Sequence, residues 1–237
     1  MFKIALDAGH GINTPGKRCL KTIDPNETRE WWMNDRICDK VESMLKAYEG
    51  YSLLRVDDTT GKTDVALSER VRKANNYNAN IYLSVHHNAG VNGGKGGGIV
   101  SIAYTSASNK SKEYQKLIYN KLIEETGLKG NRSTPLALQN LYVCRETAMP
   151  AVLVECGFMD SATDVPIILT ENFADNCAEA LVSALALIGG LKKKDSPIPT
   201  ETNGKIYRVQ VGAYSSKANA ENMQKKLKAD GYDAVIV

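Results

Sequence analysis

Residues 81–89 constrain the fold more than any other part of the chain. The first five residues of this stretch place mainly apolar side chains on both faces of an extended strand. A strand that is apolar on both faces is typical of the interior of a parallel sheet, where helices cover each side. The stretch then ends in His86, His87 and Asn88. Because only three histidines occur in the 237 residues, two adjacent ones at a predicted strand end indicate a site.

Predicted strands and helices alternate through the first 188 residues. Period-2 and short apolar patterns predict strands at residues 2–6, 51–56, 81–87, 99–104, 141–144 and 151–154, and helical patterns predict helices at residues 30–46, 67–75, 108–126 and 171–188. Such alternation predicts an α/β fold with an open, mostly parallel sheet flanked by helices. The chain is 43% hydrophobic, which is enough for a sizeable core.

The composition changes after residue 188. Residues 189–204 mix glycine, lysine and proline, which is typical of a linker. We therefore predict a catalytic domain at residues 1–188 and a separate segment at residues 205–237. This segment reads as a small C-terminal βαβ piece, with strands at 206–212 and 232–237 around a helix at 217–229, and it is too short to bury a core alone.

Charge and cysteine content exclude several classes of protein. A net charge of +3 is too small to indicate a nucleic-acid partner. The five cysteines form no CxxC pair and lie mostly in apolar segments, so we expect reduced core residues rather than a disulfide framework. No stretch approaches the roughly 20 apolar residues of a membrane span, and the N-terminus lacks the features of a Sec signal, so we expect synthesis in the cytoplasm without membrane insertion.

Four polar residues occupy equivalent places in the predicted fold. His10, His86 and Glu155 each follow a predicted strand, and Glu30 begins a predicted helix. Ligands of open α/β sheets bind outside the carboxyl ends of the strands, so these residues can converge. Two imidazoles and one carboxylate suit a catalytic zinc ion, and a second carboxylate can serve as general base for water attacking a carbonyl. This set of residues predicts amide hydrolysis.

Each of these residues also has a simpler explanation. A single histidine such as His10 more often caps or packs than binds a metal, and Glu30 would be favourable at a helix N-terminus without any ion. Glu155 needs a partner or solvent because it follows a buried strand. His86 and His87 point to opposite faces of their strand, so only one reaches a given ion, and we choose His86. Residues 93–98 are glycine-rich but lack a Lys-Ser/Thr helix start, which favours a flexible loop over a phosphate site.

Five motifs in order resemble the zinc-dependent N-acetylmuramoyl-L-alanine amidases of the type 3 class, which occur in bacterial autolysins and phage endolysins. The resemblance covers residues 3–188. Its motifs are Asp-Ala-Gly-His-Gly at residues 7–11, Glu30 with Asn34, residues 67–75 with Arg70, residues 84–89, and residues 150–158. The resemblance implies one zinc ion per chain, held by His10, Glu30 and His86, with Glu155 as the catalytic residue.

The resemblance leaves some positions open. Glu27 lies close to Glu30 and could supply the metal carboxylate instead, but only Glu30 keeps the family's spacing to Asn34. His87 stands at a position that varies in the family. We expect His87 and Asn88 to line the substrate groove.

The C-terminal segment resembles the first half of a SPOR repeat, a module associated with peptidoglycan glycan strands. The resemblance rests on residues 207–214 with Ala218, Ala220 and Gly231. A second βαβ half is missing from the sequence, so we expect either a truncated repeat or a homodimer in which two copies complete each other.

The resemblance and the residue chemistry together predict a peptidoglycan hydrolase. It would cleave the amide between N-acetylmuramic acid and the L-alanine of the stem peptide, reaching the wall through a holin or after cell lysis. Two alternatives remain at this point. One is a zinc carboxypeptidase or aminoacylase acting on another amide, and the other is a wall-binding protein without catalytic activity.

Overall fold

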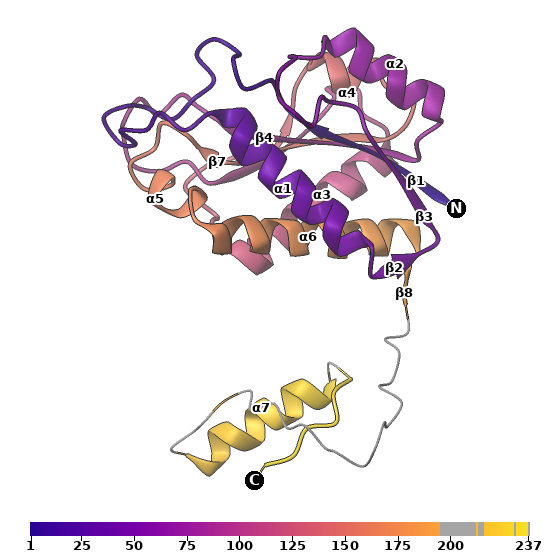
Figure 1. Cartoon of the computed structure of the whole chain (residues 1–237), viewed down its shortest axis with the longest axis vertical. Coiled ribbons are helices and arrows are strands. Elements are labelled where there is room, and N and C mark those ends of the chain that lie inside the picture. The colour runs from indigo at the N-terminus through magenta and orange to yellow at the C-terminus, as the bar shows by residue number, and fades with distance from the viewer. Residues whose placement is uncertain (195–211, 213–215, 230, 237) are drawn as a thin grey trace. The chain divides into compact units, whose positions relative to one another are not determined.

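The computed structural model describes residues 1–194, 212, 216–229 and 231–236. The chain divides into two compact units, residues 1–194 and residues 195–237. Figure 1 shows the elements of both units.

The first unit is built on a six-stranded sheet in which β4 occupies a central place. The strand order is β3-β1-β4-β7-β5-β6, and the strands are β1 (Phe2–Ala8), β3 (Tyr51–Arg55), β4 (Ile81–Asn88), β5 (Ile99–Ala103), β6 (Leu136–Leu138) and β7 (Ala151–Phe158). β4 pairs in parallel with β1 and β7, whereas β5 runs antiparallel to β7. The predicted mostly parallel sheet is confirmed, since only the pairing of β5 with β7 within this sheet is antiparallel.

Helices cover both faces of this sheet. They are α1 (Glu30–Leu45), α2 (Leu67–Tyr77), α3 (Asn109–Thr126), α4 (Tyr142–Glu146), α5 (Val165–Ile168) and α6 (Glu171–Gly189). Figure 1 shows α1, α3 and α6 on one face and α2 with α4 on the other. Ile81, Leu83 and Val85 of β4 pack in the core under the first group, and Tyr82 packs in the core under the second. The alternation read from the sequence therefore buries both faces of β4.

Local capping explains where two of the longer helices begin. The Ser108 hydroxyl accepts a hydrogen bond from the Ser111 amide at the start of α3, and the Thr170 hydroxyl accepts one from the Phe173 amide at the start of α6. Gly127 ends α3 in a left-handed conformation that favours glycine.

Two predicted features of the first unit differ from the structure. The strand predicted at residues 141–144 is wrong, because Tyr142–Glu146 form the short helix α4. The edge strand β6 was not predicted. The cysteine prediction is confirmed, since Cys19, Cys38, Cys144, Cys156 and Cys177 are all free and buried.

The first unit extends past the end of the predicted catalytic domain. Gly189 still belongs to α6, and β8 (Lys192–Lys193) pairs antiparallel with β2 (Tyr48–Glu49). Residues 189–194 of the predicted linker therefore pack on the first unit, whereas residues 195–204 lie outside the described residues.

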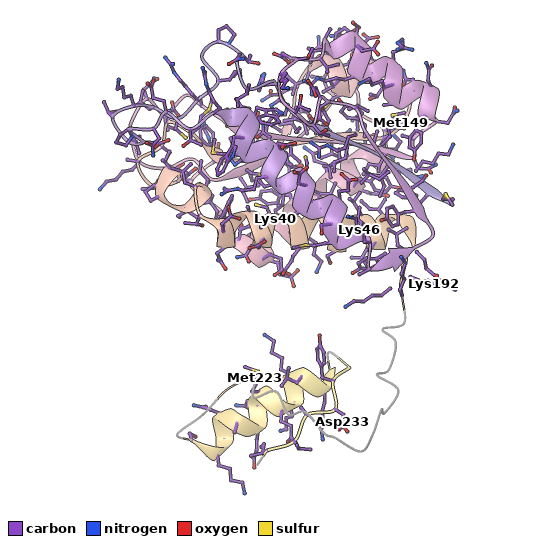
Figure 2. All side chains as sticks on the ribbon, in the orientation of Figure 1. Lys40, Lys46, Met149, Lys192, Met223 and Asp233 are labelled. Carbon is purple, nitrogen blue, oxygen red and sulfur yellow. The ribbon has the colours of Figure 1, made fainter. Side chains whose placement is uncertain are left out.

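The second unit contains α7 (Lys217–Ala229), which confirms the predicted helix. Residues 232–236 form no strand, and the carbonyl of Ala234 accepts a hydrogen bond of 2.9 Å from Gln224 Nε2 instead. Residues 206–211 of the other predicted strand lie outside the described residues. Figure 2 labels Met223 and Asp233 in this unit. Among the helices of the described ranges, none is both long and apolar enough to cross a membrane.

Candidate metal centre

Three elements bring His10, Glu30 and His86 to one place. His10 follows β1, His86 lies near the end of β4, and Glu30 is the first residue of α1. Glu30 Oε1 lies 3.4 Å from His10 Nε2 and 3.1 Å from His86 Nδ1. One ligand atom from each residue lies within 4.8 Å of the others. Two imidazoles and a carboxylate at this spacing suit a single divalent metal ion with a further position left for substrate.

The Glu30 carboxylate supports this assignment. It is only 1% exposed, and its second oxygen, Oε2, is buried without a hydrogen-bond partner among the described residues. Burial raises the pKa of Glu30, but the contacts with His10 and His86 outweigh burial and hold the pKa below its ordinary value. The carboxylate is therefore ionised. A buried anion needs a positive partner, and the Lys17 ammonium at 3.7 Å from Oε2 is too far away for a hydrogen bond, so Oε2 keeps an unused acceptor.

Glu155 lies beside this cluster on the neighbouring strand. It pairs in register with His86 across β7 and β4. Burial raises the pKa of Glu155 to about 7, and its Oε2 is buried without a hydrogen-bond partner in the described part of the chain. A carboxylate with a pKa near neutrality can both accept and return a proton under ordinary conditions.

Gly9 allows the His86 ring to approach β1. A Cβ atom at Gly9 would lie 2.0 Å from Cε1 of His86, which is far inside any normal contact. The imidazole therefore packs directly on the backbone that precedes His10.

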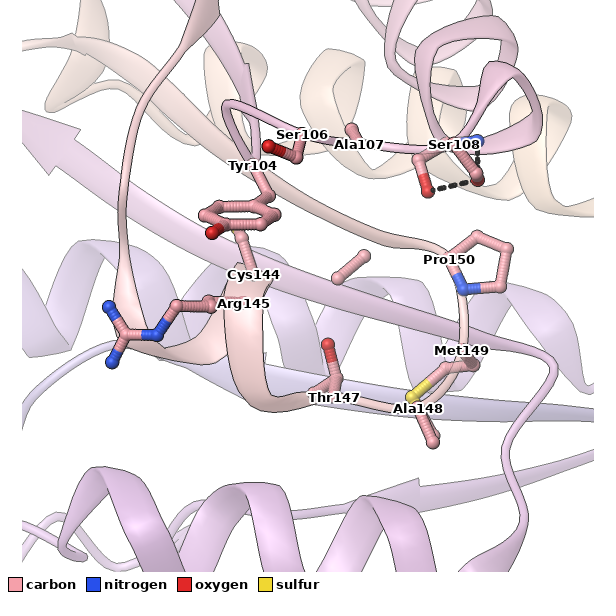
Figure 3. Close-up of a pocket in the computed structure, with 12 residues that line it drawn as sticks. Tyr104, Ser106, Ala107, Ser108, Cys144, Arg145, Thr147, Ala148, Met149 and Pro150 are labelled. Carbon is pink, nitrogen blue, oxygen red and sulfur yellow. Dashed lines mark hydrogen bonds between the residues drawn. The ribbon is translucent and has the colours of Figure 1, made fainter.

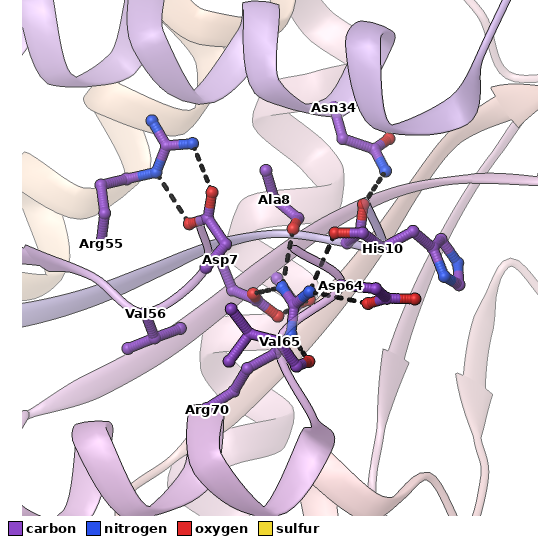
Figure 4. Close-up of polar contacts among 12 residues, drawn as sticks. Asp7, Ala8, His10, Asn34, Arg55, Val56, Asp64, Val65 and Arg70 are labelled. Atoms are coloured by element: carbon purple, nitrogen blue, oxygen red, sulfur yellow. Dashed lines mark hydrogen bonds and ion pairs between the residues drawn. The ribbon is translucent and has the colours of Figure 1, made fainter. Parts of the chain in front are cut away.

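A buried ion pair holds the backbone of the His10 segment. The Arg70 guanidinium pairs with Asp7 and donates hydrogen bonds to the carbonyls of Ala8 (2.8 Å) and His10 (2.9 Å), as Figure 4 shows. The other oxygen of Asp7 accepts bonds from Tyr82 and Ser84, each 2.7 Å long. His10 has a positive φ of 69°, and the Arg70 contacts stabilise this unusual conformation. Asp7 and Arg70 belong to two of the motifs in the sequence, but the sequence does not indicate that they contact each other.

His87 is placed differently from the prediction. Its side chain is 2% exposed, and its Nδ1 lies 2.8 Å from Asn34 Oδ1. Burial lowers the pKa of His87 to about 3, so the ring is neutral. A residue in the interior cannot line a surface groove, and the predicted groove position of His87 is therefore wrong. Asn88 is partly exposed and accepts a 2.8 Å bond from the Ala89 amide, and its predicted place in the groove stays a prediction.

Of the two candidate carboxylates, Glu30 lies in the histidine cluster and Glu27 does not. Glu27 pairs instead with Arg18 at 3.1 Å and Lys21 at 3.9 Å. Lys17 from the loop between β1 and α1 places its Nζ 3.7 Å from Glu30 Oε2. The sequence does not indicate a place for Lys17 at this site, because a lysine in a polar loop is usually solvated.

The glycine-rich segment after β4 is held by two carboxylates. Asp160 Oδ2 accepts bonds of 2.8–2.9 Å from the three consecutive amides of residues 90–92. Asp164 Oδ2 accepts bonds from the amides of Gly98 (2.7 Å) and Phe158 (2.9 Å). The segment predicted as a flexible loop is therefore anchored at both ends beside the metal centre.

A separate cavity of about 240 Å³ lies where β7 begins, at the other end of this strand from Glu155 (Figure 3). Tyr104, Cys144 and Arg145 are among its lining residues, which include no carboxylate or imidazole. Burial raises the pKa of the Cys144 thiol to about 12, so this thiol is not a nucleophile near neutral pH. The cavity does not contribute to the metal centre.

Comparison with known families agrees with this geometry. The model of the N-acetylmuramoyl-L-alanine amidase family matches residues 4–186, and the SPOR domain model matches residues 180–237. The sporulation-specific N-acetylmuramoyl-L-alanine amidase of Bacillus subtilis (strain 168) is 33% identical over 238 residues, covering 100% of this chain and 85% of that protein. An endolysin of Bacillus phage SPP1 is 33% identical over 191 residues, covering 80% of this chain and 66% of that protein.

Solved structures give the same result. The catalytic domain of CwlV, an N-acetylmuramoyl-L-alanine amidase from Bacillus (Paenibacillus) polymyxa var. colistinus, is similar with a TM-score of 0.71 and 26% identity. The match covers 81% of this chain and all of that chain. An N-acetylmuramoyl-L-alanine amidase from Clostridium difficile 630 is similar with a TM-score of 0.70 and 26% identity, over 78% of this chain and 95% of that chain.

Proposed function

The chain belongs to the N-acetylmuramoyl-L-alanine amidase family, and we propose that His10, Glu30 and His86 hold one catalytic zinc ion with Glu155 as the general base. The enzyme is a peptidoglycan hydrolase that acts on the cell wall. The observation that supports the zinc site best is the convergence of three ligand atoms within 4.8 Å beside a carboxylate on the adjacent strand.

In the proposed amide hydrolysis, His10, Glu30 and His86 hold the zinc ion, and Glu155 transfers the proton. When bound, zinc supplies a positive charge that polarises an acyl oxygen and makes water more acidic. Glu155 accepts a proton from the water that attacks the lactyl carbonyl of N-acetylmuramic acid. It then delivers this proton to the L-alanine nitrogen as the amide bond breaks, so the products are a free carboxylate on the sugar and a free amino terminus on the peptide.

Substitution of Glu155 tests this division of roles. Glu155→Ala should keep one zinc per chain and lose wall lysis, because the proton acceptor is absent while all three ligands remain. His86→Ala should lose zinc and activity together. Glu125→Ala, at an exposed position of α3, is the matched control and should change neither. Wall lysis retained by Glu155→Ala would exclude Glu155 as the base.

The products separate this reaction from other zinc-dependent amide hydrolysis. Digested wall should gain L-alanine amino termini without gaining reducing sugar. A zinc carboxypeptidase would instead release amino acids from the carboxyl end of the stem, and an aminoacylase would act on other N-acyl amino acids. Mass spectrometry of the digest, with zinc quantified in the same sample, distinguishes these outcomes.

The segment matched by the SPOR domain model is proposed to bind glycan strands of peptidoglycan. Binding there would keep the catalytic unit on an insoluble substrate between successive cuts. A homodimer through this segment stays a prediction, which the mass of the protein in solution would test. Release through a holin or after cell lysis likewise stays a prediction.

A further inference from the structure

Asn34 lies in the interior between two of the ligand-bearing segments. It follows Glu30 by one turn of α1, so both side chains face the sheet. Asn34 is fully buried, and its Nδ2 donates a 3.1 Å hydrogen bond to the carbonyl of Gly9, the residue before His10 (Figure 4). A carbonyl can only accept, so this contact fixes the orientation of the amide and turns Oδ1 towards His87.

His87 completes the connection to the third segment. Its Nδ1 lies 2.8 Å from Asn34 Oδ1, which can only accept, so the ring carries its proton on Nδ1. Nε2 is then a bare acceptor, and it is buried with no hydrogen-bond partner in the described residues. The backbone amide of His87 also donates to Glu30 Oε1 at 3.3 Å. His87 therefore contacts one metal ligand directly and follows another, His86, in sequence.

Together these contacts join the three segments that carry His10, Glu30 and His86. We propose that Asn34 and His87 form a ligand clamp, a pair of positioning residues that fixes the spacing of the three ligands and so sets the affinity of the site for zinc. Neither residue ligates the ion. The inference rests on the proposed zinc centre and adds the residues that pre-organise it.

The physical reason lies in the cost of assembling a metal site. Ligands that are already held at the right spacing lose less conformational freedom when the ion binds than ligands that move. Partners that orient metal ligands typically change metal affinity by about 10–100-fold when removed. The two side chains are almost completely buried, so truncating one of them leaves the polar group of the other without its partner.

A zinc titration of the metal-free chain of residues 1–237, in competition with a chelator, tests the clamp. Asn34→Ala should bind zinc about 10–100-fold more weakly than the wild type. The matched control is Asn75→Ala in α2, because Asn75 also uses its amide to donate to a carbonyl (Glu146, 3.2 Å) and to accept from a backbone amide (Ala148, 2.9 Å). The control should lose thermal stability without losing zinc affinity.

Two variants at His87 keep the test decisive if Asn34→Ala does not fold. His87→Gln retains a side-chain donor for Asn34 Oδ1, and His87→Leu has none. We expect the leucine variant to bind zinc much more weakly than the glutamine variant. Equal affinities for these two variants, or equal affinities for Asn34→Ala and Asn75→Ala, would overturn the clamp.

The titration also separates this inference from the function on which it rests. A wild-type protein that binds no zinc would overturn the zinc centre and the clamp together. A wild-type protein that binds zinc but does not cleave the wall would overturn the assigned reaction and leave the titration of the clamp variants valid.

Discussion

Gly9 makes the metal centre sensitive to a single methyl group. The added Cβ of alanine would meet the His86 ring at 2.0 Å, so the ring has to leave its present position. We expect Gly9→Ala to displace His86 and to lose most zinc binding while the fold persists. Zinc content per chain measures this effect. Gly127→Ala is the control, because nothing lies within 4 Å of its added Cβ, and it should keep its zinc. Equal zinc content in the two variants would contradict a local effect at Gly9.

A group of three aspartates surrounds Arg55 near α1. The guanidinium contacts Asp35, Asp39 and Asp57, so three negative charges share one positive charge. Burial raises the pKa of Asp35 to about 6, with further increases from Asp39 and Asp57, although Arg55 opposes them. Asp35 therefore titrates in an accessible pH range.

The raised pKa of Asp35 predicts how stability depends on pH. In the unfolded chain Asp35 titrates near 3.8. Between about pH 4 and pH 6 the folded state holds this proton and the unfolded state does not, so this group's contribution to stability falls as pH rises. The loss is at most about 3 kcal/mol, since each unit of pKa corresponds to about 1.4 kcal/mol.

The variant Asp35→Asn isolates this contribution. Its free energy of unfolding, measured by denaturant titration from pH 4 to pH 7, should rise relative to the wild type as pH increases. A variant that is less stable than the wild type at pH 7 would show that the ion pair with Arg55 outweighs the cost of burying the charge.

The sequence predicted the residues at strand ends better than the residues that support them. His10, His86 and Glu155 were found because period-2 patterns locate the ends of strands, and open sheets gather ligands there. The burial of His87 and the approach of Lys17 depend on tertiary contacts with Asn34 and Glu30, which no local pattern encodes. An Asn one turn after a metal carboxylate was the available signal for the clamp.

At the scale of elements, the Asp7–Arg70 pair joins α2 to the end of β1. Removing one partner leaves an uncompensated buried charge, so Arg70→Met should lower the free energy of unfolding by about 3–5 kcal/mol. The double variant Asp7→Asn with Arg70→Met should be more stable than Arg70→Met alone. Denaturant titrations of the four proteins in this cycle measure the coupling. Strict additivity of the two changes would contradict a specific pair.

The elements that were predicted wrongly are the shortest ones. Residues 141–144 are too few for periodicity to distinguish a buried strand from a helical turn, and the structure forms α4 there. β6 has three residues at the sheet edge, below the length at which alternation is visible. Long elements such as α1, α3 and α6 were predicted to within a few residues, because their apolar stripes repeat over several turns.

At the scale of the whole molecule, the two units are expected to contribute separately. A chain that ends at residue 194 keeps every residue of the metal centre, so it should cleave soluble muropeptides about as fast as the full chain. It should sediment less with insoluble wall, since it lacks residues 195–237, which are most of the segment that the SPOR domain model matches. Turnover of a soluble substrate and a wall pull-down measure the two effects. Equal wall binding by both chains would contradict a binding role for the second unit.

The antiparallel direction of β5 has a consequence for engineering. The last residues of β4 and the first residues of β5 both pair with β7 around Glu155. Residues 89–98, which connect them, therefore start and finish near the metal centre without crossing the sheet. Doubling the length of such a segment costs only about 0.6 kcal/mol of loop entropy, provided that Asp160 and Asp164 still anchor its ends. Libraries inserted here would vary the surface beside the metal centre while the sheet stays intact, which makes this turn a suitable place to select lytic enzymes against chosen bacteria.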